Sequence, residues 1–155
     1  MSKYNNHKVY IVSVSSLDKR KFYSRASAQA FCDENSIDFN ECTEIFDSDK
    51  EYQRGELLKV LEQRDEISNL QRQVEYVLIP AQYMKVLKTV RKKEVLKDKR
   101  IEAPITYKAD YVYKLPDGST VVEDVKSEMT RKLPDYIMKR KLMLYIHGIR
   151  IKEII

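Results

Sequence analysis

A strand-like run that carries three charges, residues 119–126 (STVVEDVK), constrains this chain more than any other segment. Its β-branched residues are typical of a buried strand, yet Glu123, Asp124 and Lys126 interrupt them. Burying a charge costs free energy unless the charge is paired or holds a metal. Because side chains two positions apart share a face of a strand, Asp124 and Lys126 point the same way and Glu123 points the other way. The segment therefore predicts a strand whose polar groups have a specific role.

A tight turn is expected to join this strand to a second one. Residues 105–115 (ITYKADYVYKL) read as a strand, and residues 116–118 (PDG) follow as a turn signal. Asp110 and Asp124 each lie seven positions from Asp117. In a hairpin they are nearly opposite, at about 5 Å, where two carboxylates repel each other and the pKa of one rises. A divalent cation removes this repulsion, and carboxylate oxygens suit Mg²⁺ or Mn²⁺.

Lys126 completes a set of groups suited to phosphodiester hydrolysis. A metal held by two carboxylates polarises a phosphoryl oxygen, and a lysine positions the water or stabilises charge on the phosphate. Of the 24 acidic residues, Asp124 alone is followed by a lysine two positions later. On spacing alone, an ordinary ion pair between Asp124 and Lys126 is the alternative. Glu123 is the alternative acid if the strand register slips by one residue.

The remaining patterns predict one mixed α/β domain with a central sheet flanked by helices. Outside the hairpin, the expected strands cover 8–14, 70–79 and 149–154, and the expected helices lie within 24–34, 46–67 and 134–147. Residues 84–100 are compatible with a helix and with an extended ribbon. In the last helix, Met138, Leu142 and Tyr145 have the spacing of an apolar stripe.

One stripe of the helix in residues 46–67 contains an acid. Glu51, Gly55 and Leu58 fall at i, i+4 and i+7 and therefore share a face of that helix. This spacing places Glu51 beside the packed face. A glutamate in a first helical turn also suits the helix dipole, which is the alternative role for Glu51.

Positive charge is concentrated in two blocks of a chain whose net charge is +5. Residues 84–100 carry eight Lys or Arg and two acids, and residues 129–152 carry seven and one. Two basic blocks on an acidic remainder favour an anionic partner, with nucleic acid first. A solvated basic face is the alternative.

Several other functions have no support in the sequence. The two cysteines, at 32 and 42, and the two histidines, at 7 and 147, lack the spacing of a zinc motif. The three glycines are isolated, so no glycine-rich phosphate loop is present. No apolar run approaches the ~20 residues that span a bilayer, and the first residues lack the apolar core of a signal peptide. The chain is expected in the cytoplasm, with no membrane partner.

In the order of its charged residues the chain resembles the PD-(D/E)XK nuclease superfamily. The pattern there is an acid on a helix, an aspartate at a strand end and an acid-x-lysine triplet on the next strand; Glu51, Asp110 and Asp124-Val125-Lys126 match it in order. The resemblance implies a restriction-endonuclease-like core that binds Mg²⁺ or Mn²⁺. Asp110, Asp124 and the Val125 carbonyl are the implied ligands. Glu51 supports the metal, and Lys126 orients or activates the water.

Other segments are similar to a small phage-encoded family of this superfamily, whose members are Holliday-junction-resolvase-like or unassigned. The landmarks are KYNN, FDSDKE, LQRQVEY, ADYVY, VVEDVKS and KRKL. They cover about residues 42–155 and the first few residues of one nuclease domain, residues 1–155. Ala109 replaces the proline of the superfamily's name, and residues 13–44 are interpreted as an insertion whose role the pattern does not assign. The resemblance implies an endonuclease for DNA, with branched DNA such as a Holliday junction as substrate, acting in phage recombination or replication in the host cytoplasm.

Further residues are expected to contact the DNA. They are Gln73, Lys92, Lys93, Arg100, Lys139 and Lys141. Contacts to phosphates give an affinity that falls steeply with salt and little base specificity. Two symmetric incisions in a junction imply a homodimer.

Two alternative functions remain open. The first is a non-cleaving DNA-binding or recombination accessory protein with the same fold. The second is a phage interaction protein with an acidic or protein partner and no role in nucleic-acid binding. Four tyrosines flank the proposed site, and for them packing is the ordinary role while stacking on unpaired bases is the functional one. They are Tyr107, Tyr111, Tyr113 and Tyr136.

Overall fold

The computed structural model describes the backbone of residues 7–90 and 93–155, and the side chains of residues 7–89 and 94–155. It divides into two compact units, residues 1–64 and residues 65–155. Both units combine strands and helices, which confirms the mixed α/β class. A single nuclease domain with an insertion at 13–44 stays a prediction. None of the helices in the described residues is both long and apolar enough to cross a membrane.

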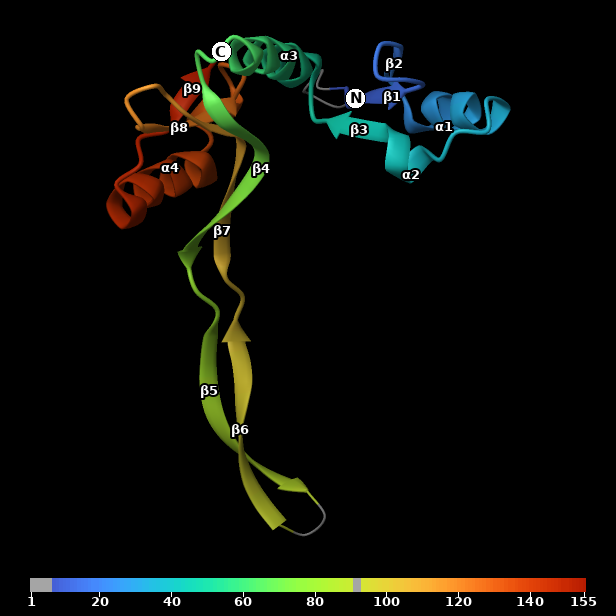
Figure 1. Ribbon diagram of the computed structural model, residues 1–155. Coiled ribbons are helices and arrows are strands. Elements are labelled where there is room, and N and C mark those ends of the chain that lie inside the picture. The colour runs from blue at the N-terminus through green and yellow to red at the C-terminus, as the bar shows by residue number, and fades with distance from the viewer. Residues whose placement is uncertain (1–6, 91–92) are drawn as a thin grey trace. The chain divides into compact units, whose positions relative to one another are not determined.

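The first unit contains a three-stranded antiparallel sheet in the order β2-β1-β3 (Figure 1). Its elements are β1 (Val9–Ser13), β2 (Lys19–Phe22), α1 (Arg25–Glu34), α2 (Phe39–Cys42), β3 (Thr43–Phe46) and α3 (Asp49–Gln63). The sequence predicted β1, α1 and α3 and missed the other three. The missed elements have four residues each, too few for a periodic pattern to show.

The two faces of β1 pack into separate apolar clusters of the first unit. Tyr10 and Val12 pack with residues of α1 and α2, including the buried thiol Cys32. Val9 and Ile11 form a second cluster that also contains Phe46 of β3. This alternation is what the period of two in a strand requires.

The second unit is built on a four-stranded mixed sheet in the order β4-β7-β8-β9. Its elements are β4 (Ser68–Ile79), β7 (Ile105–Lys114), β8 (Thr120–Val125), a 3₁₀ turn η1 (Thr130–Lys132), α4 (Pro134–His147) and β9 (Lys152–Ile154). The pairs β4-β7 and β7-β8 are antiparallel, and β8-β9 is parallel. A parallel pair needs a crossover connection, which α4 supplies. This mixed sheet with its helix is compatible with a restriction-endonuclease-like core.

Helix α4 packs on this sheet through a face that the sequence analysis did not select. The stripe Met138, Leu142 and Tyr145 was wrong for two of its residues, because Met138 is 56% exposed and Tyr145 is 88% exposed, whereas Leu142 is partly buried and packs against the core. The buried residues of α4 are Tyr136 and Met143, two helical turns apart. Apolar residues occur around much of this helix, so spacing alone could not select the packed face.

The hairpin of β7 and β8 has the register that counting from the turn predicted. Tyr111 pairs with Glu123, and the ladder continues in register to Lys114 and Thr120. One step further in the same register, Asp110 lies opposite Asp124. The turn closes with a hydrogen bond from the Gly118 N–H to the Leu115 carbonyl, 2.9 Å, and the positive φ of Gly118 (83°) explains why a glycine stands there.

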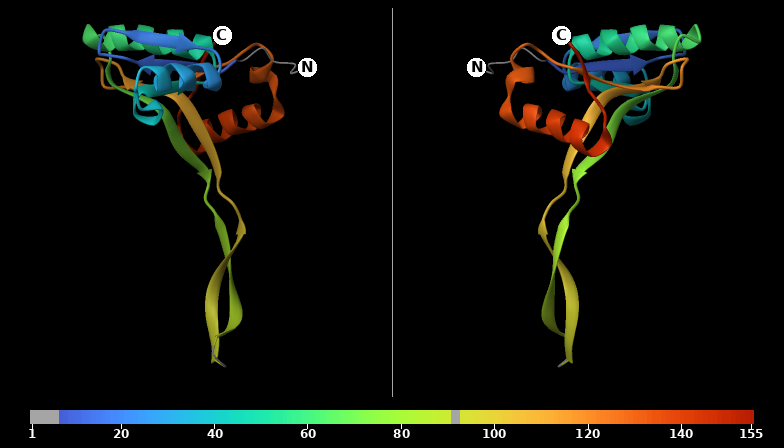
Figure 2. Two further views of the ribbon diagram at one scale, coloured as in Figure 1. Left: turned by 90° about the vertical axis from the view of Figure 1, so that its right-hand side faces the viewer. Right: turned by 90° about the vertical axis from the view of Figure 1, so that its left-hand side faces the viewer.

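Residues 84–100 form an extended ribbon, not a helix. Strands β5 (Gln82–Val90) and β6 (Lys93–Glu102) pair with each other as a two-stranded antiparallel sheet, here called the ribbon. The ribbon continues the antiparallel course of β4 and β7 beyond Pro80 and Pro104 (Figures 1 and 2). A proline cannot donate a ladder hydrogen bond, which accounts for the break between the two sheets.

Candidate functional site

Asp110 of β7 and Asp124 of β8 form the centre of the site. Asp124 is fully buried, and Asp110 Oδ2 accepts a hydrogen bond from the Val125 N–H at 2.7 Å. Burial and the charge of Asp124 raise the pKa of Asp110 to about 8, although the Val125 N–H and the Lys126 charge oppose this shift. The repulsion between two carboxylates that the hairpin predicted is therefore present in the structure.

Lys126 shares the site with Asp124. Its Nζ lies 2.6 Å from Asp124 Oδ1, which confirms that the two side chains occupy one face. The ammonium also lies 5.5 Å from the centre of the Tyr136 ring. A cation on an aromatic face is favourable, so Tyr136 helps to hold Lys126 beside the carboxylates.

Three buried oxygen atoms around Asp124 make no hydrogen bond of good geometry with a described residue, although both tyrosine hydroxyls lie close enough to the carboxylate to interact with it. They are Asp124 Oδ2 and the hydroxyls of Tyr107 and Tyr136. Burial, with the charge of Asp124 as the next cause, raises the pKa of both tyrosines. Buried polar atoms are normally satisfied, and exceptions mark sites where an ion or a water belongs. The two tyrosines thus line the site as well as the core.

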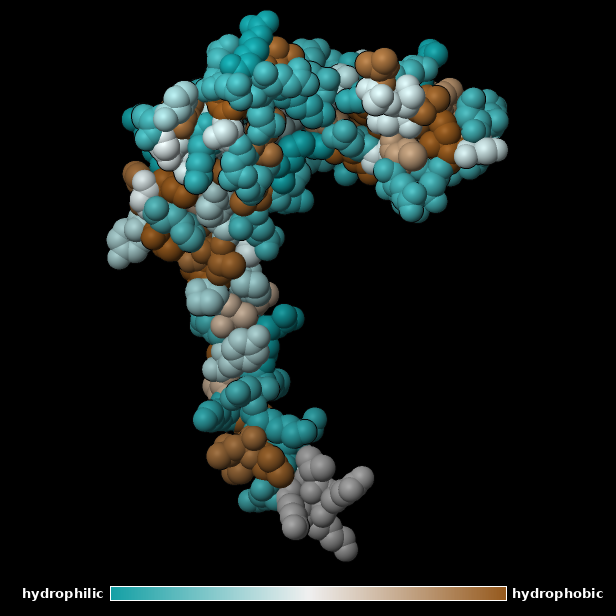
Figure 3. Space-filling view, in the orientation of Figure 1, coloured by the Kyte–Doolittle hydropathy of each residue, from teal (hydrophilic) through white to brown (hydrophobic). Residues whose placement is uncertain are grey.

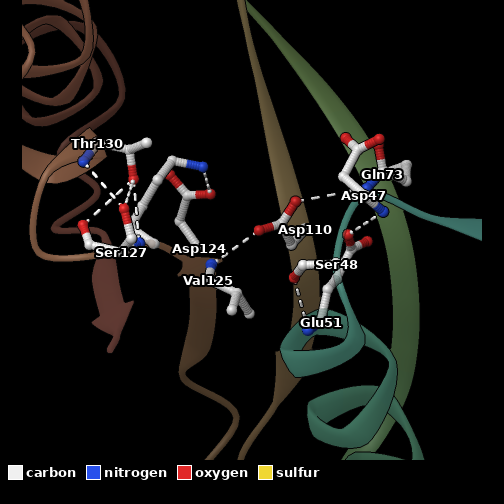
Figure 4. Close-up of polar contacts among 10 residues, drawn as sticks. Asp47, Ser48, Glu51, Gln73, Asp110, Asp124, Val125, Ser127 and Thr130 are labelled. Atoms are coloured by element: carbon white, nitrogen blue, oxygen red, sulfur yellow. Dashed lines mark hydrogen bonds and ion pairs between the residues drawn. The ribbon is translucent and has the colours of Figure 1, made fainter. Parts of the chain in front are cut away.

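Gln73 of β4 lies against Asp110 on the other side (Figure 4). Its Nε2 donates to Asp110 Oδ1 at 3.4 Å. The φ of Gln73 is +55°, a left-handed conformation inside a strand that stays in register on both sides of it. A non-glycine residue pays about 1–2 kcal/mol for this conformation, and such strain is concentrated at functional sites. This strain was not visible in the sequence.

Glu51 belongs to the first unit, where it caps α3. Its Oε2 accepts from the Asp47 N–H at 2.9 Å, and its own N–H donates to Ser48 Oγ at 3.1 Å (Figure 4). Glu51, Gly55 and Leu58 are all buried, which confirms the predicted stripe. The cap gives Glu51 a structural role. Its support of a metal stays a prediction.

Glu123 is satisfied by a different set of partners on the opposite face of β8. It accepts from Tyr113 Oη at 2.6 Å and from Lys152 Nζ at 2.9 Å. The hydrogen bond and charge of Glu123 raise the pKa of Lys152. The alternative in which a register slip makes Glu123 the site acid is therefore wrong, because the observed register keeps Glu123 with Lys152.

The predicted DNA-contacting lysines of α4 line two cavities of the second unit. Lys141 lines a cavity of about 700 Å³ whose wall carries five cationic side chains and one carboxylate. Lys139 lines a second cavity of about 410 Å³. Arg131 and Arg140, which the sequence analysis did not single out, belong to the first cavity and pair with Glu153. Their meeting depends on the parallel pairing of β9, which no local pattern shows.

The predicted contacts in the ribbon are only partly described. Arg100 is exposed on β6. Lys93 is described as the first residue of β6 by its backbone alone, and Lys92 lies outside the described residues.

The donor set of the site fits a magnesium-type cation. Among the described residues, no group of three or more His, Cys, Asp or Glu is arranged to hold a metal. Mg²⁺ does not require one, since it keeps several waters and binds through one or two carboxylates plus substrate phosphates. The orphaned Asp124 Oδ2 and the protonation of Asp110 are the two features that such a cation would resolve.

Comparison with known proteins identifies a family whose function is unknown. The model of the family described as protein of unknown function (DUF1064) matches residues 35–152, which include both strands of the hairpin and Glu51. The comparison with curated proteins and the comparison with solved structures each found no match.

Proposed function

The chain belongs to the DUF1064 family, and we propose that it is a metal-dependent endonuclease that hydrolyses DNA phosphodiester bonds. One observation carries the proposal: Asp110 and Asp124 lie close enough across the hairpin for their charges to interact, Lys126 contacts Asp124, and Asp124 Oδ2 makes no hydrogen bond of good geometry among the described residues. The residue order that resembles PD-(D/E)XK nucleases supports the same function.

The two aspartates and the Val125 carbonyl would hold the Mg²⁺ or Mn²⁺ ion. When bound, the ion would polarise a phosphoryl oxygen and lower the pKa of a water molecule. Burial and the charge of Asp124 raise the pKa of Asp110, and a bound cation would favour its ionised form because the positive charge stabilises the carboxylate. The Gln73 amide and the Val125 N–H hold the Asp110 carboxylate in place from two sides.

Lys126 supplies the positive charge that the reaction needs near the phosphate. Its ammonium is held by Asp124 and by the Tyr136 ring, so it is positioned before substrate binds. A fixed charge of this kind stabilises the negative charge that builds up in the transition state.

The surroundings of the site favour a polyanionic substrate. The cavity that includes Lys141 and Arg150 is lined mainly by cations, and its Glu153 is the register partner of Asp124 on β9. We extend the proposal to branched DNA, such as a four-way junction in phage recombination or replication. A homodimer and a cytoplasmic location belong to this extension.

Two lysine variants separate catalysis from simple charge pairing. Lys126 and Lys152 each pair with a fully buried carboxylate of β8. Lys126→Gln is expected to lower Mg²⁺-dependent nicking of plasmid and junction DNA by on the order of 100-fold or more. Lys152→Gln, the matched control, is expected to keep activity within a few-fold. The assay compares Mg²⁺, Mn²⁺ and EDTA.

The same assay distinguishes the alternatives. If the wild-type protein binds junctions at low salt but cuts no DNA with either metal, the non-cleaving accessory function is correct. If both lysine variants lose activity equally, the role of Lys126 is structural.

A further inference from the structure

The ribbon has two unlike faces. Residues that pair across an antiparallel ladder share a face, and successive pairs alternate between faces. On one face three consecutive pairs each join a lysine to an apolar residue. We call this the lysine face, and its pairs are Met84–Lys99, Val86–Lys97 and Lys88–Val95.

The opposite face carries no net charge. It holds two cations and two acids, with an apolar pair between them. We call this the balanced face, and its pairs are Tyr83–Arg100, Lys85–Asp98, Leu87–Leu96 and Thr89–Glu94. The three pairs of the lysine face contain no carboxylate, and the nearest one on that face is Glu102, which pairs with Gln82 beyond a register irregularity.

Nothing in the described part of the protein neutralises or covers the lysine face. Lys88, Lys97 and Lys99 are exposed and make no ion pair with a described residue. Met84 and Val95 between them are 54% and 42% exposed, and Figure 3 shows apolar side chains exposed along the ribbon among hydrophilic ones. A two-stranded ribbon is marginally stable alone in water. An arm of this kind is expected to gain stability from a partner, and here the charge requires an anionic one.

We propose that the lysine face binds the phosphate backbone of duplex DNA, with the ribbon lying in a groove. The choice of DNA over another polyanion rests on the proposed function. The major groove, about 12 Å wide, admits a two-stranded ribbon. Side chains on one face of a strand repeat about every 6.8 Å, which equals two base-pair steps of about 3.4 Å. Arg100, which the sequence placed among the DNA contacts, lies on the balanced face and is not part of this surface.

A duplex fits the surface better than a membrane does. A membrane presents a flat array of charge, which would contact only one line of a narrow ribbon. An acidic strand would show the same repeat of about 6.8 Å, so the choice of DNA over an acidic protein rests on the proposed function. Both remain outcomes of the test below.

The test compares two double variants that each remove two positive charges from the ribbon. Lys97→Gln/Lys99→Gln changes the lysine face, and Lys85→Gln/Arg100→Gln changes the balanced face. Binding of a fluorescent 30-base-pair duplex is measured in EDTA across a series of salt concentrations. The first variant is expected to bind about tenfold more weakly or worse, with the slope of log K against log salt smaller by about 1.8. The second is expected to keep the wild-type slope.

Three results would overturn the proposal. Equal losses in both variants would show that net charge, not one face, attracts DNA. No loss of duplex affinity in either variant would mean that DNA binds outside these two faces of the ribbon. A selective loss of binding to polyglutamate or to phosphatidylserine vesicles, with duplex affinity kept, would identify a protein or a membrane as the partner. Circular dichroism checks that each variant is folded. The single variant Lys97→Gln is a milder change, for which the slope of log K against log salt is expected to be smaller by about 0.9.

The result is independent of cleavage. Binding in EDTA needs no metal, so a failure to cut DNA leaves this test intact.

Discussion

Asp110 and Asp124 define the account at the scale of single residues, because two carboxylates close together in a buried hairpin are unfavourable without a third group. The structure supplies part of that group as Lys126 on one oxygen and the Val125 N–H on another. Asp124 Oδ2 makes no hydrogen bond of good geometry with a described residue. The repulsion between the two carboxylates is expected to make the stability of the metal-free protein depend on pH.

The metal-free protein is expected to lose stability as the pH rises. In the folded protein Asp110 keeps its proton up to about pH 8, whereas the unfolded chain loses it near pH 4. The stabilising contribution is therefore complete below pH 4 and disappears as the pH rises through about 8. In EDTA, urea unfolding should show the wild type losing about 2–3 kcal/mol between pH 6 and pH 9 relative to Asp110→Asn. An identical pH response in both proteins would mean that the carboxylates do not interact.

The left-handed conformation of Gln73 is expected to lower the stability of the protein, while its side chain supports function through Asp110. Gln73→Gly removes the strain of a left-handed non-glycine residue, so the free energy of unfolding should rise by up to about 1 kcal/mol. The same change removes the amide from Asp110, so DNA cleavage should fall. Gln71→Gly, two positions away and paired regularly with Val112, should instead destabilise by about 0.5–1 kcal/mol. If both variants are destabilised equally, the conformation of Gln73 is not strained.

At the scale of elements, the hairpin was predictable and the long-range packing was not. Counting from residues 116–118 gave the observed register, because a tight turn fixes the pairing of its strands. The mixture of basic and apolar residues in 84–100 did not separate a ribbon from a helix. The packed face of α4 and the pairing of β9 with β8 depend on distant partners, so no local pattern contained them.

Glu51 shows that local patterns are also limited in predicting the candidate site. Its burial and its stripe followed from helical spacing, and both were confirmed. Its cap on α3 is local and satisfies the same side chain. Whether it also serves the metal depends on tertiary structure that helical spacing cannot express.

Two glycines are expected to stabilise their elements only through the backbone. Gly118 in the hairpin turn and Gly148 at the end of α4 have positive φ, and an added Cβ would meet nothing within 4 Å at either position. Gly118→Ala and Gly148→Ala should each cost about 1 kcal/mol, since only the left-handed conformation is penalised. Urea unfolding measures both. A loss well above this value at either position would point to a contact that the side-chain packing does not show.

At the scale of the whole molecule, the basic surfaces described here belong to the second unit. The ribbon carries the lysine face, and the cavity beside α4 carries Lys141 and Arg150. A molecule that cuts a junction symmetrically needs two such sites. Sedimentation velocity with a four-way junction should therefore show two chains per junction, and the products should carry paired incisions. One chain per junction with single nicks would agree with an endonuclease but would contradict symmetric cutting of the junction by a dimer.

The most direct measurement of the central claim is anomalous diffraction from crystals soaked in Mn²⁺. The account predicts one peak in contact with both Asp110 and Asp124, and its loss in crystals of Asp124→Asn. A wild-type crystal at saturating Mn²⁺ with no peak there, and with Lys126 still on Asp124, would contradict it.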